Sequence, residues 1–326
     1  MSLPRMEPRI GPRIGIALGS GSARGWAHIG ILEALSEAGI KPEIVCGTSI
    51  GALVGAAYAG NRLAELHQWG EALTWREIVR LLDLRLRRGG LIDGRAIIAF
   101  MHRLRLDMPI ETLPKRYAAV ATDLATGKEV VFGKGPVDAA IRASIALPGI
   151  FSPVLVEGRW MLDGGLVNPV PVSVCRALGA DFVIAVNLNS QLVGRRFTEV
   201  PGTRRRNGRP EILDRLIETM PAAFRQQAPL EAPAEPKPVR SPDPGYFDVL
   251  ANSINIMQEQ ITNLRLAAET PEMLLSPQLR DIGLLEFNRA EEAIAEGRAT
   301  AERALPDLRR KLGLQAKAAD PAARNE

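Results

Sequence analysis

Short β-branched runs alternate with longer helical stretches from about Pro12 to Asn189, and this alternation restricts the fold more than any other feature of the sequence. The runs are short, apolar and bounded by turn residues, which predicts buried strands. They are Arg13–Leu18, Glu43–Cys46, Tyr117–Asp123, Glu129–Phe132 and Phe182–Asn187, and the first helical stretches are Trp26–Ala38 and Ser49–Ala59. Such an order predicts a layered α/β fold around a largely parallel sheet.

The chain after Asn189 has a different composition. Residues 191–245 are rich in Pro, Arg, Gln and Ala, which predicts a mobile insertion with one short amphipathic helix over residues 212–220. Residues 246–315 predict C-terminal helices, one of them over Leu284–Ala304, and another with an apolar stripe that is expected to pack on the sheet. The stripe consists of Phe247, Leu250, Ile254, Met257, Ile261 and Leu264. Residues 1–11 and 316–326 are expected to form a flexible N-terminus and a disordered tail.

Composition narrows the class of protein. With 326 residues, of which 46% are hydrophobic and 24% charged, the chain matches an ordinary soluble globular protein. Its two cysteines, Cys46 and Cys175, favour a reducing cytoplasm over a disulfide framework. No segment has the pattern of a secretory signal or of a membrane span. No His pair or Asp-rich loop has metal-ligand spacing, so no metal or cofactor is expected.

The net charge of +4 is unevenly distributed along the chain. Six arginines between Arg195 and Arg209 are opposed by Glu199 alone, and such a cluster suits an anionic surface. Peripheral contact with the inner face of an anionic membrane is one hypothesis for this segment, and a solvated basic loop is an equal alternative. No nucleic-acid partner is expected, and the oligomeric state is open.

The strongest local signal is Gly47-Thr48-Ser49-Ile50-Gly51, between a predicted strand and a predicted helix. A serine at such a corner lies on a strained turn with its hydroxyl projecting outward, and flanking glycines let the turn pack tightly. The N-terminus of the following helix directs unpaired N–H groups at whatever Ser49 attacks. The pattern predicts Ser49 as a nucleophile, with a tight turn and a capping serine as the alternative.

A second segment of small residues, Gly19–Gly25, follows the first strand and opens the first helix. Bare backbone N–H groups in such a loop can bind an anion. The anion would be a dinucleotide phosphate or the oxyanion of a tetrahedral intermediate. A dinucleotide site needs an acidic residue near the end of the second strand, where this chain has Ser49 instead. The loop therefore favours an oxyanion hole.

The base that would activate Ser49 is identified by exclusion. An α/β-hydrolase triad runs in the order Ser, Asp or Glu, then His, but no histidine follows residue 102. The histidines of this chain are His28, His67 and His102. Asp163 ends a short apolar run, and a carboxylate that is close and partly desolvated can accept the serine proton. The ends of parallel strands gather at one edge of a sheet, which would place Asp163 near Ser49.

In this order the segments resemble the patatin-like phospholipases, and more narrowly the bacterial members with a short N-terminus. The marks of that family are a glycine-rich loop with Arg or Lys before its last glycine, a Gly-x-Ser-x-Gly elbow and a later Asp-Gly-Gly. Here they are Gly19–Gly25 with Arg24, Gly47–Gly51 and Asp163-Gly164-Gly165, and a fourth family-like block covers Arg142–Val154. The resemblance spans about Arg13–Asn189 and, more loosely, Asp281–Gly297.

The resemblance implies a three-layer α/β/α fold over residues 12–315 and a Ser–Asp dyad that hydrolyses acyl esters of phospholipids or lysophospholipids. Ser49 would attack the carbonyl, and Asp163 would accept its proton and return it to the leaving alcohol. The oxyanion would be bound by the N–H groups of Gly21, Ser22 and Ile50. Arg24 would brace the loop or meet the lipid phosphate. The supporting glycines would be Gly19, Gly25, Gly47, Gly51, Gly164 and Gly165.

One departure from the family pattern is Ser20-Gly21-Ser22, where members often have three successive glycines. A serine keeps its backbone N–H, but its Cβ restricts positive φ. The sequence therefore leaves open a slow or silent hydrolase and, with it, a non-catalytic lipid-binding or regulatory protein. An acyltransferase is the remaining alternative, although its expected histidine base is not found.

Overall fold

The computed structural model describes residues 11–74, 77, 84–87, 90–92, 94–190 and 246–314. The chain divides into two compact units, one formed by Met1–Leu192 with Ser253–Glu326 and the other by Val193–Asn252. Of the second unit, only residues 246–252 are described, and they form the beginning of a helix. The predicted arginine cluster, the predicted helix over residues 212–220 and the predicted tail 316–326 therefore lie outside the described residues, as do residues 1–10.

The described residues form strands, helices and short 3-10 turns with the following bounds. The strands are β1 (Ile14–Leu18), β2 (Ile44–Thr48), β3 (Leu84–Arg87), β4 (Gly90–Ile92), β5 (Arg116–Asp123), β6 (Glu129–Phe132), β7 (Val154–Val156), β8 (Arg159–Asp163), β9 (Phe182–Val186) and β10 (Met273–Leu275). The helices are α1 (Ala27–Glu37), α2 (Ile50–Ala59), α3 (Leu63–Ala72), α5 (Arg95–Arg103), α6 (Val137–Ser144), α7 (Val172–Ala177), α9 (Tyr246–Ala268) and α10 (Ala290–Lys311). Short 3-10 turns are η1 (Ser22–Trp26), η2 (Ile110–Thr112), η3 (Gly164–Leu166) and η5 (Phe287–Arg289).

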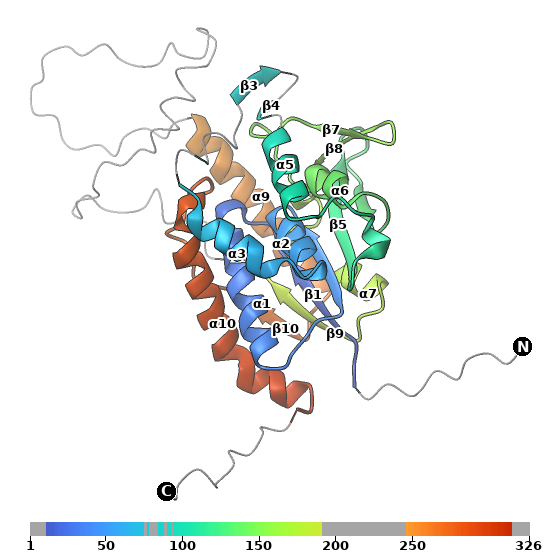
Figure 1. The fold of residues 1–326 in the computed structure, drawn as a ribbon, viewed down its shortest axis with the longest axis vertical. Helices are drawn as coiled ribbons and strands as arrows, with labels where there is room; N and C mark the ends of the chain where they lie inside the picture. The colour runs from blue at the N-terminus through green and yellow to red at the C-terminus, as the bar shows by residue number, and fades with distance from the viewer. Residues whose placement is uncertain are drawn as a thin grey trace, which may run out of the picture. The chain divides into compact units, whose positions relative to one another are not determined.

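The first unit is built on an eight-stranded sheet (Figure 1). Strands β10, β9, β1, β2 and β5 are neighbours in that order, and all of these pairings are parallel. Strands β6 and β8 pair with β5, and β7 pairs with β8, in antiparallel fashion. The predicted α/β class with a mostly parallel central sheet is confirmed. A separate two-stranded ribbon consists of β3 and β4.

Strand β5 extends beyond the end of its parallel neighbour β2, and this extension is central to the site. Thr48, the last residue of β2, pairs with Val120, and the next residue of β5, Ala121, pairs with Asp163 at the end of β8. The opposite edge of β5 is taken by β6, which pairs with both Val120 and Ala121. Because a strand has only two edges, β2 and β8 lie end to end along one edge of β5 and run towards each other.

One part of the prediction for Asp163 is wrong. It places this residue at the edge of the sheet as the end of a parallel strand, but β8 is antiparallel to β5. Asp163 reaches the same edge because β8 runs back along the extension of β5 until it meets the end of β2. A short apolar run does not encode strand direction, since direction depends on the connection that precedes the strand.

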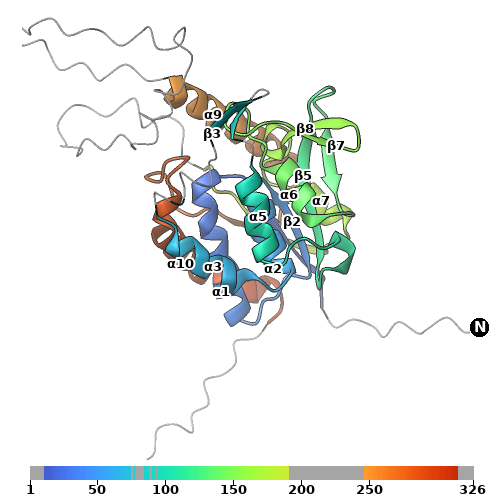
Figure 2. The ribbon, with the colours of Figure 1, turned by 45° about the horizontal axis from the view of Figure 1, so that its top comes forward.

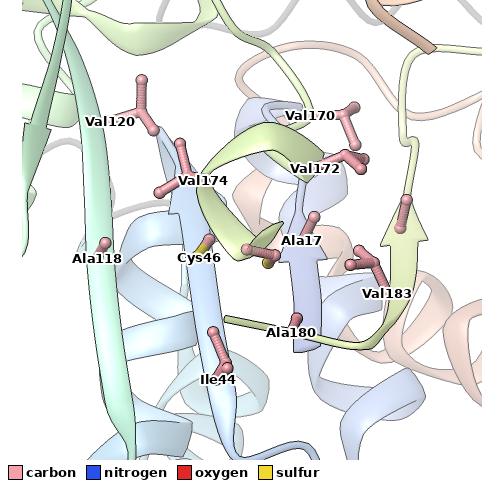
Figure 3. Packing of buried hydrophobic residues seen from close by; sticks show 12 residues of the cluster. Ala17, Ile44, Cys46, Ala118, Val120, Val170, Val172, Val174, Ala180 and Val183 are labelled. Carbon is pink, nitrogen blue, oxygen red and sulfur yellow. The ribbon is translucent and has the colours of Figure 1, made fainter. Parts of the chain in front are cut away.

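Helices cover both faces of the sheet, so the three-layer arrangement is confirmed (Figures 1 and 2). On one face, α7 closes a core of small and β-branched side chains that includes Ala17, Cys46 and Ala118 (Figure 3). Leu266 of α9 packs against the same core. On the other face α2 lies so close that a Cβ at Gly55 would be 3.0 Å from Val45. Residues alternate between the two faces along each strand, which accounts for the nearly continuous apolar runs of buried parallel strands.

Helices α1 and α10 lie side by side although they come from opposite ends of the described chain (Figures 1 and 2). A Cβ at Gly30 of α1 would be 2.0 Å from the carbonyl oxygen of Ile294, and a Cβ at Gly297 of α10 would be 2.0 Å from that of Ala27. The two backbones therefore approach at a distance that only glycine permits. Arg298 adds ion pairs from α10 to Glu33 and Glu37 of α1.

The C-terminal helices confirm the predicted class of structure but differ in detail. The prediction that the whole apolar stripe of α9 packs on the sheet is wrong, because Met257 is 48% and Leu264 73% exposed, whereas Ile254 is buried. The buried face instead contains the polar residues Gln258 and Thr262. Strand β10 was not expected, and α10 begins at Ala290 rather than at residue 284. None of the described helices is long and apolar enough to cross a bilayer.

Candidate active site

Ser49 lies between β2 and α2, at the corner predicted from the glycine pattern. Its backbone has φ 60° and ψ −125°, a conformation that costs a non-glycine residue free energy and that occurs at functional turns. The turn is tight because a Cβ at Gly47 would lie 2.3 Å from the carbonyl oxygen of Gly51. A Cβ at Gly51 would in turn lie 2.2 Å from the carbonyl oxygen of Leu18. These contacts hold the start of α2 against the end of β1.

The hydroxyl of Ser49 donates a hydrogen bond of 2.6 Å from Oγ to Oδ2 of Asp163. Its backbone N–H donates to Oγ of Ser144 over 2.8 Å, and this hydroxyl donates to the carbonyl oxygen of Val120 over 2.6 Å. Ser144 thus ties the strained turn to β5, the strand along which the two halves of the site meet. The structure therefore places Ser49 and Asp163 in direct contact, although they are 114 positions apart in the sequence.

Asp163 is fully buried, and several groups fix its orientation. Oδ1 accepts a hydrogen bond of 2.7 Å from the N–H of Gly165, its backbone N–H donates to Ala146, and its carbonyl oxygen accepts from the hydroxyl of Thr122. Burial raises the pKa of this carboxyl to about 6, and the hydrogen bonds from Ser49 and Gly165 limit the rise. The carboxylate can therefore be ionised at neutral pH and still be basic enough to accept a proton.

The glycines after Asp163 serve close packing. A Cβ at Gly164 would be 2.2 Å from the carbonyl oxygen of Val120, and a Cβ at Gly165 would be 2.3 Å from Nε2 of Gln258. The turn after β8 therefore packs against β5 on one side and against α9 on the other.

Two backbone N–H groups of the loop of residues 19–25 have no hydrogen-bond partner among the described residues. Those of Gly19, Ser20, Ala23 and Arg24 donate to backbone carbonyls of Val186, Pro169, Leu284 and Gly21. Those of Gly21 and Ser22 make no hydrogen bond with the described part of the chain. Both residues line a narrow cleft together with Ser49. The two N–H groups are therefore available to an anion beside the Ser49 hydroxyl.

The serine at position 22 adopts the backbone conformation that the sequence left in question. Its φ is 51°, in the left-handed region that favours glycine. Gly21 is required for a different reason, because a Cβ there would lie 2.7 Å from the side chain of Leu188. The substituted loop thus keeps a turn in which two successive N–H groups have no partner within the part of the chain that the structure describes.

The N-terminus of α2 lies against this loop. A Cβ at Gly25 would be 2.2 Å from the side chain of Ile50, the first residue of α2. The N–H of Ile50 makes no hydrogen bond with other described residues. It belongs to the first turn of a helix, where the partial positive charge of the helix dipole favours an anion. Residues 21, 22 and 50 thus come from two elements that pack directly on each other.

Arg24 braces the loop from within the protein. It is 2% exposed, and its Nε donates to the carbonyl oxygen of Gly21 over 3.1 Å. Its NH2 group donates to Oδ1 of Asn255 on α9, also over 3.1 Å. Of the two roles considered for Arg24, this geometry fits loop support rather than contact with a lipid phosphate.

The histidines have partners other than Ser49. His28 is buried, and its Nε2 donates to the carbonyl oxygen of Gly19 over 2.8 Å. Burial lowers the pKa of His28 to about 4, so the ring is neutral at physiological pH and supports the loop. His67 contacts Glu33 on α1, and His102 contacts Asp138 on α6.

The cleft beside Ser49 combines polar loop residues with apolar side chains. It is lined by Ser20, Gly21, Ser22, Ser49, Leu147, Ile254, Gln258 and Leu284. Leu147 belongs to the block over residues 142–154 that the sequence singled out, whereas Ile254 and Gln258 come from α9. No group of three or more potential metal-ligating side chains is found among the described residues.

Sequence reasoning missed four polar residues around this cleft. Ser144 lies in the family-like block of residues 142–154. That block was identified by its position between the Ser49 corner and Asp163, and no role was predicted for its serine. Asn189, Asn255 and Gln258 gave no signal, because helical periodicity directs attention to apolar positions. Their contacts depend on the approach of α9 to the loop of residues 19–25.

The chain is similar to known proteins over most of its length. The model of the patatin-like phospholipases matches residues 16–176. An uncharacterized NTE family protein of Mycobacterium tuberculosis is 35% identical over 327 aligned positions, which cover 88% of this chain and 89% of that protein. Patatin-like phospholipase domain-containing protein 6 of Homo sapiens is 36% identical over 180 positions, which cover 53% of this chain and 13% of that much longer protein. On this evidence the chain belongs to the patatin-like phospholipase family.

Proposed function

We propose that this protein is a serine lipid acyl hydrolase in which Ser49 is the nucleophile and Asp163 its only proton acceptor. The single observation that carries the proposal is the 2.6 Å hydrogen bond from the Ser49 hydroxyl to a fully buried carboxylate. Membership of the patatin-like phospholipase family supports a lipid hydrolase function in general.

The reaction proceeds in two halves. Oγ of Ser49 attacks the ester carbonyl carbon while its proton passes to Asp163, and the protonated carboxyl then gives this proton to the leaving alcohol as the C–O bond breaks. The acyl group is then bound to Ser49. In the second half, Asp163 accepts a proton from water, the resulting hydroxide attacks the acyl-enzyme, and the proton returns to Oγ of Ser49. The acid is released and both residues regain their starting state.

The oxyanion formed in each half is stabilised by the unpaired N–H groups of Gly21 and Ser22 and by that of Ile50. Each such donor contributes about 10²- to 10³-fold to the rate in serine hydrolases. The positive φ of Ser22 supports this role, because it allows two adjacent N–H groups to remain free in one turn.

The proposed substrate is a phospholipid or lysophospholipid. The apolar side chains of Leu147, Ile254 and Leu284 beside the nucleophile suit an acyl chain. Lipid substrates are aggregated, so we further propose that the protein acts at a membrane surface in the cytoplasm as a peripheral protein.

A fluorophosphonate probe tests this proposal directly. Purified protein should form a covalent adduct that peptide mass spectrometry locates on Ser49, and it should release fatty acid from lysophospholipid vesicles. The exposed Ser253 provides the matched control, since Ser253→Ala should label at the rate of the parent protein. A wild-type protein that neither labels nor releases fatty acid would favour the non-catalytic lipid-binding reading. Transfer of the acyl group to an added alcohol in preference to water would favour an acyltransferase.

The pH dependence of kcat/KM reports the base. Because Asp163 must be ionised to accept the serine proton and its pKa is raised to about 6, activity should be low at pH 4.5 and rise to a plateau above pH 7. The measurement uses a soluble short-chain ester, so that vesicle charge does not change with pH. A rise centred at pH 8 or above would contradict Asp163 as the base.

A further inference from the structure

A buried glutamine of helix α9, Gln258, contacts the oxyanion loop, that is, the loop of residues 19–25. Oε1 of Gln258 accepts a hydrogen bond from the hydroxyl of Ser20 over 3.1 Å and another from Nδ2 of Asn189 over 3.1 Å. Nδ2 of Asn189 also donates to the Ser20 hydroxyl over 3.1 Å. The three side chains form a closed triangle, and all three are buried. A buried network in which each member restrains the others is rigid and costly to break.

The same glutamine lies against the turn that follows Asp163. Its Nε2 is 2.3 Å from the position that a Cβ at Gly165 would occupy, so the amide packs directly on the Gly165 backbone. The N–H of Gly165 is the group that donates to Oδ1 of Asp163. One side chain thus contacts both the loop of the proposed oxyanion hole and the turn that orients the proposed base.

A second side chain of α9 reaches the same loop one turn earlier. Oδ1 of Asn255 accepts from Arg24, whose Nε donates to the carbonyl oxygen of Gly21. Asn255 and Gln258 are three positions apart and therefore lie on the same face of the helix, about one turn from each other. The side chain of Ser20 and, through Arg24, the carbonyl group of Gly21 are thus both linked to α9, on either side of the N–H of Gly21.

Ser20 has a reason to be serine in this arrangement. The hydroxyl donates to Gln258 and accepts from Asn189, so it acts both as a donor and as an acceptor within the network. A glycine at position 20 would leave the amide groups of two buried residues without this partner. The departure from three successive glycines thus coincides with a polar contact to α9.

We propose that Gln258 is a positioning residue that holds the oxyanion loop and the Asp163 turn in register with each other. This inference rests on the proposed hydrolase function. Gln258 acts on the reacting groups through Ser20 and Gly165, which it contacts directly. Its effect is on the transition state, because the free N–H groups must meet an oxyanion that exists only after attack, and a displacement of about 1 Å can cost about 100-fold in rate.

The test compares Gln258→Met, Ser20→Ala, the double variant and Gln260→Met on a soluble short-chain ester. Methionine keeps the length of the side chain and removes both amide functions. We expect Gln258→Met to lower kcat about 10- to 100-fold with KM changed less than about threefold, because ground-state binding does not use the oxyanion donors. Ser20→Ala should lower kcat about tenfold. Gln260 is exposed on the same helix, and Gln260→Met should behave as the wild type.

The double variant separates a shared contact from two independent effects. Both substitutions break the same interaction, so the double variant should be no slower than Gln258→Met alone. A kcat of Gln258→Met within twofold of the wild type would overturn the proposal, and so would losses that multiply in the double variant. If Gln258→Met does not fold, Ser20→Ala decides, and an unchanged kcat overturns the proposal. A wild-type protein without hydrolase activity would overturn the proposed function itself and this inference with it.

Discussion

Replacement of Asp163 by Asn is expected to lower kcat about 10²- to 10⁴-fold, the usual contribution of a general base, since Asp163 is the carboxylate that the Ser49 hydroxyl contacts among the described residues. Asn keeps the size of the side chain, and its oxygen can still accept from the N–H of Gly165. It cannot accept the proton of Ser49. Steady-state hydrolysis of a soluble ester measures the loss, and residual activity above about a tenth of the wild type would contradict the dyad.

The same substitution should make the protein more stable at neutral pH. Burial raises the folded-state pKa of Asp163 to about 6, against about 3.9 for an unfolded chain. A carboxyl whose pKa is raised in the folded state costs no stability at a pH below its unfolded-state pKa. The cost grows as the pH rises from there through the folded-state pKa. Above pH 6 it is of the order of 2–3 kcal/mol. The variant should therefore melt several degrees higher than the wild type at pH 8 and at the same temperature at pH 4.

An exposed aspartate serves as the control for both parts of this prediction. Asp281→Asn removes the same charge at a side chain that is 71% exposed. It should change neither kcat nor the pH dependence of the melting temperature. Equal melting temperatures of wild type and Asp163→Asn across the pH range would show that the charge of Asp163 is not buried at a cost.

Gly297→Ala is expected to destabilise the fold by about 3 kcal/mol, the upper end of the usual cost of overpacking a close-packed core. The expected change in stability is opposite to the usual one, because replacement of a glycine inside a helix by alanine normally stabilises the protein by about 1 kcal/mol. Here the new Cβ would lie 2.0 Å from the carbonyl oxygen of Ala27, so α10 would have to move away from α1. Loss of this packing also affects the site, since η1 lies at the start of α1.

Chemical denaturation monitored by circular dichroism measures the change in the free energy of unfolding. Gly133→Ala is the matched control, because a Cβ at Gly133 meets nothing within 4 Å and its φ is ordinary. That variant should lie within about 0.5 kcal/mol of the wild type. A Gly297→Ala protein as stable as the control would mean that the two helices are not in backbone contact.

The elements that sequence predicts well are those in which local pattern and burial agree. The runs that became β1, β2, β5 and β9 are apolar on both faces, because helices cover both faces of the sheet. The corner at Ser49 is predictable because its glycines are required by close backbone contacts, either within a few residues of the turn or with the adjacent strand. Constraints of this kind can be recognised from the residues of the segment itself.

The features that sequence reasoning missed depend on contacts between distant segments. The direction of β8 is set by the preceding hairpin with β7, and the five residues of β8 itself do not indicate it. The buried face of α9 is polar at Gln258 because this residue contacts the loop of residues 19–25, and at Thr262 the buried hydroxyl donates to the carbonyl oxygen of Gln258 within the helix. A rule that equates apolar with buried assigns Met257 and Leu264 to the wrong side.

The meeting of β2 and β8 along one edge of β5 has a consequence for how such chains can change length. The distance between Ser49 and Asp163 is set by the consecutive residues Val120 and Ala121 of β5, which pair with the ends of β2 and β8. It does not depend on the length of the chain that separates the two residues, which are 114 positions apart. Turns with open space around Gly127, Gly133 and Gly158 could accept insertions without moving either residue. By contrast, removal of one residue from β8 would turn Asp163 to the opposite face of the sheet. Insertions in these turns should therefore be tolerated in this family, whereas insertions or deletions within β5 or β8 should not.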